Sequence, residues 1–191
     1  LMNMIAEPEL FEAVLSKITD FYLRSNEIYF DYVKEKLDIV MIGNDFGTQI
    51  STIASPELLR KLVFPYVNKI TNQIKSYGYK VLYHSCGSVF ELIPDMIDAN
   101  VDIIHPLQAK AKDMDIQNIK NNYYGKVAFC GAVDAQELLV LGSPEEVYSQ
   151  VMKIRRIMPS GVIISPSHEA VLPDIPPQNI EAMAKAVKEI L

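Results

Sequence analysis

The residues best suited to chemistry are the chain's three histidines and two cysteines, namely His84, Cys86, His105, Cys130 and His168. A neutral imidazole and a thiolate are good zinc ligands, and a catalytic zinc site combines three protein ligands with one open position. His84 and Cys86 lie two residues apart, so on an extended strand their side chains point to the same face. We therefore predict a zinc site with His84 and Cys86 as ligands and either His168 or Cys130 as the third.

A purely structural role is the alternative for each of these residues. Cysteine is among the most buried residue types and often packs as a small hydrophobe. Packing is the favoured role for Cys130, which continues an apolar run, and for His105, whose following proline indicates a shaped turn. For His84 and Cys86 the two roles are evenly balanced on residue type alone. His168 has the most functional setting, because it lies in the polar stretch SPSHE after an apolar run.

Oxygen donors accompany these residues in two loops. Glu169 directly follows His168, and Asp45 lies in the stretch GNDFGTQ together with Gln49. That stretch is punctuated by glycine but matches neither a P-loop nor a dinucleotide-binding fingerprint. Asp45 and Gln49 are candidates to face a substrate, although Asp45 could equally cap a turn.

Five short apolar runs predict buried strands, and they are Ile39–Ile42, Val81–Tyr83, Val101–Ile104, Val127–Phe129 and Val162–Ile164. Their continuous apolar character is typical of strands that are covered on both faces. Helical patterns separate them, over Pro8–Leu37, after Ser55-Pro56-Glu57, after Ser143-Pro144-Glu145 and over Ile180–Ile190. This alternation predicts βαβ units with a parallel sheet. The histidines and cysteines then fall at the carboxyl ends of the strands, where such folds place their active sites.

Two α/β architectures fit these elements. One is an open, doubly wound sheet of five strands. The other is part of a (β/α)8 barrel, which has eight strands and typically about 250 residues. The chain has 191 residues and opens with a helix, so the barrel interpretation implies that the first strands are absent. No linker or low-complexity segment divides the chain, and we expect residues 1–191 to form a single domain.

Composition excludes several classes of function. The net charge is −6 and no basic cluster occurs, which argues against a nucleic-acid partner and against an anionic membrane surface. No apolar stretch approaches the roughly 20 residues that span a bilayer. Two cysteines are too few for a disulfide framework, so we expect a cytoplasmic protein.

Four stretches of the chain resemble the carboxyl-terminal part of the uroporphyrinogen decarboxylase superfamily. They are GNDFGTQISTIASPELLRKLVFPYVNKI, YHSCGSVFELIPDMIDANVDIIHPLQ, GKVAFCGAVDAQELLVLGSPEEV and GVIISPSHEAVLPDIPPQNIEAMAKAV. The resemblance implies a (β/α)8 barrel of roughly twice this length, to which residues 1–191 contribute about the last five βα units. It therefore favours the barrel over the open sheet.

The resemblance implies one of two activities. One branch comprises zinc-dependent methyltransferases, which move a methyl group between a corrinoid (methylcobalamin) protein and a thiol or similar acceptor. His84 and Cys86 match the HxC pair that holds zinc in that branch, and His168 stands where those enzymes commonly have cysteine. On this basis we expect zinc on His84, Cys86 and His168, with His168 and Asp45 as catalytic residues. The residues expected to bind a small-molecule substrate are Gln49, His105, Gln108 and Glu169.

The other branch decarboxylates the acetate side chains of uroporphyrinogen III in tetrapyrrole biosynthesis without a cofactor. A histidine at the position of His168 contacts substrate there, but the HxC pair is missing and the arginine-rich substrate segment lies in the amino-terminal part. All four arginines of this chain fall in predicted helices, namely Arg24, Arg60, Arg155 and Arg156. A third possibility is a non-catalytic half-barrel. Its open sheet edges would require pairing with the missing amino-terminal half or with a second copy.

Overall fold

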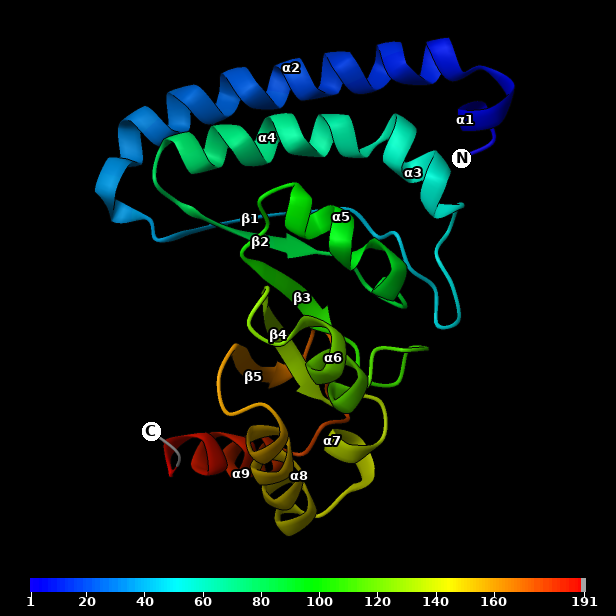
Figure 1. Cartoon of the computed structure of the whole chain (residues 1–191). Helices are drawn as coiled ribbons and strands as arrows, with labels where there is room; N and C mark the ends of the chain where they lie inside the picture. Colours follow the sequence, from blue (N-terminus) through cyan, green and yellow to red (C-terminus); the bar gives the residue numbers. More distant parts are fainter. Residues whose placement is uncertain (190–191) are drawn as a thin grey trace.

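A sheet of five parallel strands forms the centre of the structure, a computed structural model that describes residues 1–189 (Figure 1). The strands are β1 (Ile39–Gly43), β2 (Lys80–His84), β3 (Ile103–Leu107), β4 (Ala128–Val133) and β5 (Val162–Pro166). All five strands expected from the apolar runs are confirmed. Their ends differ by a few residues, and two of these differences affect candidate site residues.

The third and fourth strands extend further than their apolar runs predicted. His105 was expected directly after a strand but lies within β3, and Cys130 was expected at the end of a strand but lies in the middle of β4. Pro106 has no N–H to donate to the sheet. The pairing of β3 with β4 shifts register between Ile104 and Leu107, which accommodates the proline inside a buried strand.

The order of the strands in space is the order in the chain, and every neighbouring pair is parallel. A doubly wound sheet would contain a point at which the strand order reverses, and this sheet contains none among its five strands. Sequential parallel order is the arrangement of a (β/α)8 barrel. The fold is therefore α/β, with five strands of a partial barrel.

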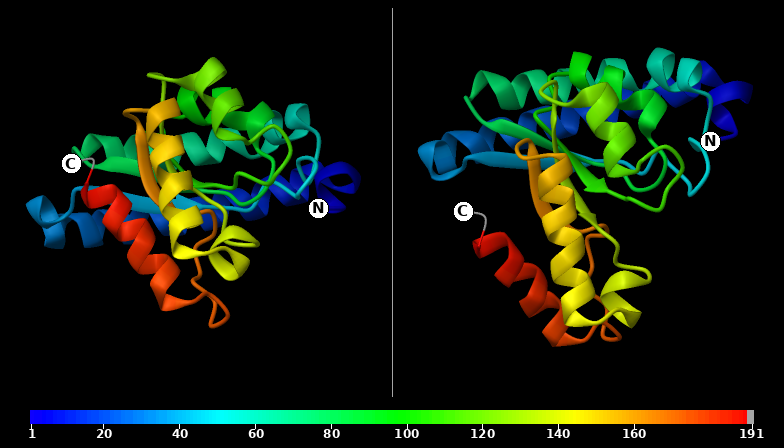
Figure 2. Two further views of the ribbon diagram at one scale, coloured as in Figure 1. Left: turned by 90° about the horizontal axis from the view of Figure 1, so that it is seen from below. Right: turned by 60° about the horizontal axis from the view of Figure 1, so that its bottom comes forward.

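Helices connect the strands and pack against the sheet. They are α1 (Asn3–Ala6), α2 (Pro8–Val33), α3 (Pro56–Leu62), α4 (Phe64–Ser76), α5 (Ile93–Asp98), α6 (Ile116–Tyr123), α7 (Leu138–Leu141), α8 (Pro144–Ile157) and α9 (Pro177–Lys188), with 3-10 turns η1 (Lys34–Lys36) and η2 (Phe90–Leu92). In Figures 1 and 2, α2 packs along α4 near β1, while α8 packs along α9 at the β5 end. None of the helices in residues 1–189 combines the length and apolar character needed to cross a membrane.

Helix starts follow the predicted signals. Ser55 caps α3 by accepting the N–H of Leu58, and Ser143 forms a capping box with Glu146 at the start of α8. The first long helix ends at Val33 instead of continuing to position 37. The last helix begins at position 177, three residues before the prediction, and the predicted end at position 190 lies outside the described residues.

The outer face of α2 carries a row of exposed apolar side chains at helical spacing, namely Leu10, Val14, Ile18, Phe21, Ile28 and Tyr32. The neighbouring edge strand β1 is also uncovered. Its Ile39 and Met41 are 42% and 56% exposed. By contrast, Tyr83 on β2 and Phe129 on β4 are fully buried between the sheet and the helices. Apolar surface is therefore exposed at one end of the sheet.

Candidate metal centre

The strand register sets Gly43, His84 and His105 side by side across β1, β2 and β3. Residues at the same register in neighbouring strands point to the same face of the sheet. A side chain at position 43 would begin 2.4 Å from the carbonyl oxygen of His84 and 2.6 Å from its Cβ. Glycine at this position therefore allows β1 to lie this close to the backbone and Cβ of His84.

The loops that follow β1 and β2 pack backbone against backbone. A Cβ on Gly47 would lie 2.5 Å from the carbonyl oxygen of Cys86, and a Cβ on Gly87 would lie 2.5 Å from the carbonyl carbon of Gly47. Gly87 also has a φ of +82°, a conformation that side chains disfavour. The N–H of Ser88 donates to the carbonyl of Thr48 at 2.7 Å. Both glycines are thus required for this close approach.

Hydrogen bonds hold the metal-binding candidates in these loops. The N–H of Cys86 donates to Asp45 Oδ1 at 3.0 Å, so the Asp45 carboxylate is held next to Cys86. The N–H of Gly87 donates to Gln108 Oε1 at 2.7 Å. Gln108 was predicted to bind substrate, and the structure buries it under the loop that carries Cys86.

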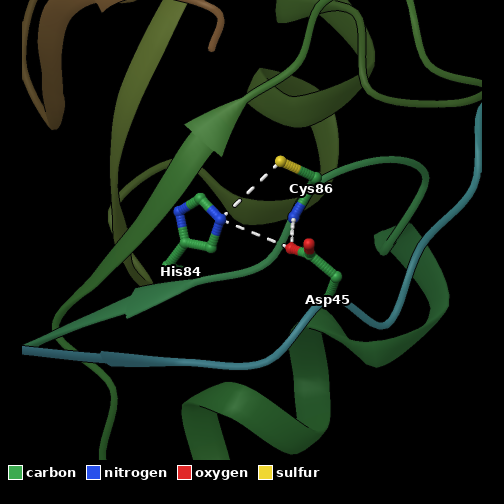
Figure 3. A group of neighbouring side chains, drawn as sticks. All are labelled: Asp45, His84 and Cys86. Atoms are coloured by element: carbon green, nitrogen blue, oxygen red, sulfur yellow. Dashed lines mark hydrogen bonds and ion pairs between the residues drawn. The ribbon is translucent and has the colours of Figure 1, made fainter. Parts of the chain in front are cut away.

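Asp45, His84 and Cys86 bring three different donor atoms together (Figure 3). His84 Nε2 lies 3.3 Å from Asp45 Oδ1 and 3.7 Å from Cys86 Sγ. A tetrahedral zinc with bonds of about 2.0–2.3 Å separates its ligand atoms by about 3.3–3.6 Å. The three donors therefore fit a zinc ion in both chemistry and spacing.

A second donor group shares the same cysteine and comes from the loop after β5. Cys86 Sγ lies 3.6 Å from Glu169 Oε2, and that oxygen lies 3.4 Å from His168 Nε2. Within residues 1–189, no group of donors all within 4.8 Å of one another unites His84, Cys86 and His168. Asp45 takes the third position beside His84 and Cys86, and the His84/Cys86/His168 ligand set stays a prediction.

The charges around Cys86 favour a cation. Burial raises the pKa of the Cys86 thiol to about 12, and the neighbouring carboxylates of Glu169 and Asp45 add to this effect. Burial alone would raise the pKa of Glu169, but its own N–H and the nearby His168 outweigh burial and lower it. No lysine or arginine in the described part of the chain lies within 4.0 Å of either carboxylate. A bound divalent cation would supply the missing positive charge.

His105 and Cys130 are buried in the sheet. His105 Nδ1 lies 3.0 Å from His84 Nδ1, and burial together with His84 lowers the pKa of His105, so its ring is neutral at pH 7. Burial also raises the pKa of the Cys130 thiol, which is partly offset by Ser165. Cys130 belongs to neither donor group among the described residues.

The positions and contacts of Gln49 and Ser85 do not follow from residue type alone. Gln49, a predicted substrate contact, is exposed on the loop after β1, where its carbonyl accepts the N–H of Lys112 at 2.9 Å. Ser85 was not singled out, yet it is fully buried between His84 and Cys86 and its Oγ accepts the N–H of Phe46 at 2.9 Å. The signal in the sequence that could have pointed to Ser85 is that glycine-containing stretches follow two neighbouring predicted strands.

A hollow of about 470 Å³ opens beside the donors, and it is lined by Met41, Ile42, Gly43, Asn44, Asp45 and His84. The hollow has a mixed apolar and polar lining, and a small molecule bound in it would lie against His84 and Asp45. A larger hollow, about 760 Å³, lies at α7 and α8 and contains none of the donor residues. We place the candidate site at the smaller hollow because His84 and Asp45 line it.

Comparison with known proteins gives two matches of different kinds. The family model described as Uroporphyrinogen decarboxylase (URO-D) matches residues 1–190. A solved structure described as "methyltransferase from Methanosarcina mazei" has a TM-score of 0.77 at 19% sequence identity, covering 98% of this chain and 52% of that chain. Curated protein sequences give no significant match. The structural match shows the shared fold, and this chain spans about half the length of that structure.

Proposed function

The chain belongs to the uroporphyrinogen decarboxylase family, and we propose that its site binds zinc for methyl transfer from a corrinoid protein to a thiol or similar acceptor. The observation that carries this proposal is the Asp45/His84/Cys86 donor group, which has zinc-like spacing. A half-buried thiol lies between two carboxylates, neither of which has a lysine or arginine partner among residues 1–189, and this supports the same proposal.

His84 Nε2 and Cys86 Sγ are the two ligands on which the proposal depends. Asp45 supplies the third donor in the arrangement described above, and His168 is the alternative from the opposite side of Cys86. Zinc lowers the pKa of a coordinated thiol and so makes a thiolate nucleophile available at neutral pH. The hollow beside His84 and Asp45 gives the acceptor its route to the site.

Residues around the metal-binding atoms would orient the methyl acceptor and take up the proton of its thiol. A methylcorrinoid would supply the methyl group and its cobalt would keep the electron pair of the broken carbon–cobalt bond, while the acceptor thiol would lose its proton as its sulfur takes the methyl group. If Asp45 is the third zinc ligand, His168 Nε2, which lies 3.4 Å from Glu169 Oε2, is free to receive that proton. The backbone N–H of Cys86 holds Asp45 in place, so the site is organised before any ligand enters.

Uroporphyrinogen decarboxylation is the second candidate, and the family match over residues 1–190 favours it. A substrate with many carboxylates needs cationic partners, preferably arginine. The arginines of this chain lie on α2, α3 and α8, and Arg60 pairs with Asp95 at 2.7 Å. Residues 1–189 thus contribute no arginine to the donor site. Tight binding of uroporphyrinogen by zinc-free protein would favour this candidate over methyl transfer.

The complete activity is proposed for a larger assembly, because the chain spans about half the length of the matching structure. The edge of β1, with the exposed Ile39 and Met41, is free to pair with a further strand. The apolar row on α2 lies beside that edge and would pack against a further helix. We propose that additional βα units, in the same polypeptide or in a second chain, cover both surfaces.

Zinc content per chain tests the proposed function. We expect about one zinc per wild-type chain purified without added metal, as a site with one full donor set requires. Cys86→Ser should lose the metal because it removes the sulfur that both donor groups share. Cys130→Ser is the matched control, since that cysteine lies outside the groups, and it should retain zinc. A wild-type chain without zinc, even after incubation with a zinc salt, would contradict the proposal.

A further inference from the structure

A pair of histidine rings lies behind the donor group. His84 and His105 occupy the same register on β2 and β3, and their Nδ1 atoms are 3.0 Å apart. The N–H of Ser85 donates to the carbonyl of His105 at 2.7 Å, which fixes the two strands at this point. The His105 residue is 9% exposed, so its ring has little freedom to turn away.

A contact of this length between two ring nitrogens requires one hydrogen between them. A neutral imidazole carries its hydrogen on one nitrogen, and the other nitrogen is an acceptor. One Nδ1 is therefore the donor and the other is the acceptor. The tautomer of one ring thus determines which Nδ1 of the pair carries the hydrogen.

We infer that His105 is a positioning residue, whose Nδ1 accepts the Nδ1–H of His84 and holds His84 Nε2 toward Asp45 and Cys86. The inference rests on the zinc site of the proposed function. A nitrogen that binds a metal ion carries no hydrogen, so a metal-binding Nε2 places the hydrogen of His84 on Nδ1. His105 Nδ1 must then be the acceptor, and its own hydrogen lies on Nε2.

The metal-free state has the opposite arrangement. His84 Nε2 lies 3.3 Å from Asp45 Oδ1, an acceptor, and its hydrogen is best placed on Nε2 when no metal is bound. His105 then donates from Nδ1 to His84 Nδ1 across the 3.0 Å contact. Zinc binding therefore moves the hydrogen of His84 to Nδ1 and the hydrogen of His105 to Nε2.

Two variants separate the hydrogen bond from the bulk of the ring. Asparagine branches at Cγ as imidazole does, so the Oδ1 of His105→Asn can accept a hydrogen bond close to the original Nδ1 position. His105→Leu fills similar space without an acceptor. Loss of a partner of this kind lowers metal affinity by about 10–100-fold. We expect that loss in His105→Leu, and an affinity close to wild type in His105→Asn.

The test measures zinc affinity by competition with a chromophoric chelator on wild type and both variants, after circular dichroism has compared their folding. Equal zinc affinity of wild type and folded His105→Leu would overturn the inference while leaving the proposed function intact. A wild-type chain that binds no zinc would overturn both. Weakened binding in His105→Leu together with recovery in His105→Asn would support the inference.

A second readout needs no variant. Long-range ¹H–¹⁵N correlation spectra distinguish the two tautomers of each histidine in wild-type protein. We expect His105 to carry its hydrogen on Nδ1 without metal and on Nε2 with zinc bound. A zinc-loaded chain in which His105 retains the Nδ1 hydrogen would overturn the inference, even if the leucine variant fails to fold.

Discussion

Gly87→Ala tests whether the loops after β1 and β2 are joined as described. A methyl group at this position would lie 2.5 Å from the carbonyl carbon of Gly47 and 2.5 Å from the carbonyl oxygen of Thr48. Both are backbone atoms, so no side-chain rotation can relieve the contact. Gly78→Ala is a matched control, because Gly78 has a φ of +84° and nothing within 4 Å of an added Cβ.

Both variants lose stability through backbone strain, and Gly87→Ala loses more through the steric clash of its methyl group. Placing alanine in the left-handed region costs about 1–2 kcal/mol, and we expect that loss of unfolding free energy in Gly78→Ala. Forcing a methyl group into a filled space costs about 1–3 kcal/mol more. Gly87→Ala should therefore lose about 2–5 kcal/mol in total, as the sum of the two costs.

Urea unfolding followed by circular dichroism measures both losses, and zinc titration of the folded variants measures the effect on the site. Separation of the loops in Gly87→Ala would move Asp45 away from Cys86, whose N–H it accepts at 3.0 Å. Zinc affinity should then fall in Gly87→Ala and stay unchanged in Gly78→Ala. Equal losses of stability in the two variants would refute the described packing of the loops.

Three further predictions concern charges. Asp45→Asn keeps an oxygen for the Cys86 N–H but removes the carboxylate, and chelator competition should show weaker zinc binding; unchanged affinity would assign the third ligand elsewhere. In metal-free protein the alkylation rate of Cys86 should keep rising up to about pH 12, because burial and carboxylates raise its thiol pKa; a plateau near pH 9 would contradict this. Although burial opposes it, hydrogen bonds from Lys75 and the Val81 N–H lower the pKa of Asp102. Its stabilising effect is present above the unfolded-state pKa of about 4 and is lost as pH falls through the lower folded-state value, so Asp102→Asn should destabilise the chain at pH 7 and much less in acid. Equal destabilisation in urea titrations at both pH values would contradict that assignment.

Local patterns predicted most of the fold. Continuous apolar runs identified the five strands, including the edge strand β1 with its exposed Ile39 and Met41, and serine followed by proline identified the starts of α3 and α8. The ends of the strands were less predictable. The third strand was predicted to end at Ile104 because Pro106 indicated a shaped turn, but the shift in register between β3 and β4 lets the strand continue through the proline.

Parts of the site depend on contacts that leave no local signal. Asp45 and Cys86 are 41 residues apart, and their contact arises only when the two loops meet through glycine backbones. The HxC spacing indicated that His84 and Cys86 share a face, but the register that sets His105 behind His84 is a property of the assembled sheet. Gln108, which is predicted to bind substrate, also accepts the N–H of Gly87, a contact that no local pattern indicates.

Anomalous diffraction at the zinc absorption edge, on crystals of the zinc-loaded chain, shows whether His84 and Cys86 hold the metal. We expect one strong peak about 2.0–2.1 Å from His84 Nε2 and about 2.3 Å from Cys86 Sγ. Either Asp45 Oδ1 or His168 Nε2 should complete the ligand set, and the map would decide between them. A peak away from His84 and Cys86, or no peak in fully loaded crystals, would contradict the assignment of this site as a metal centre.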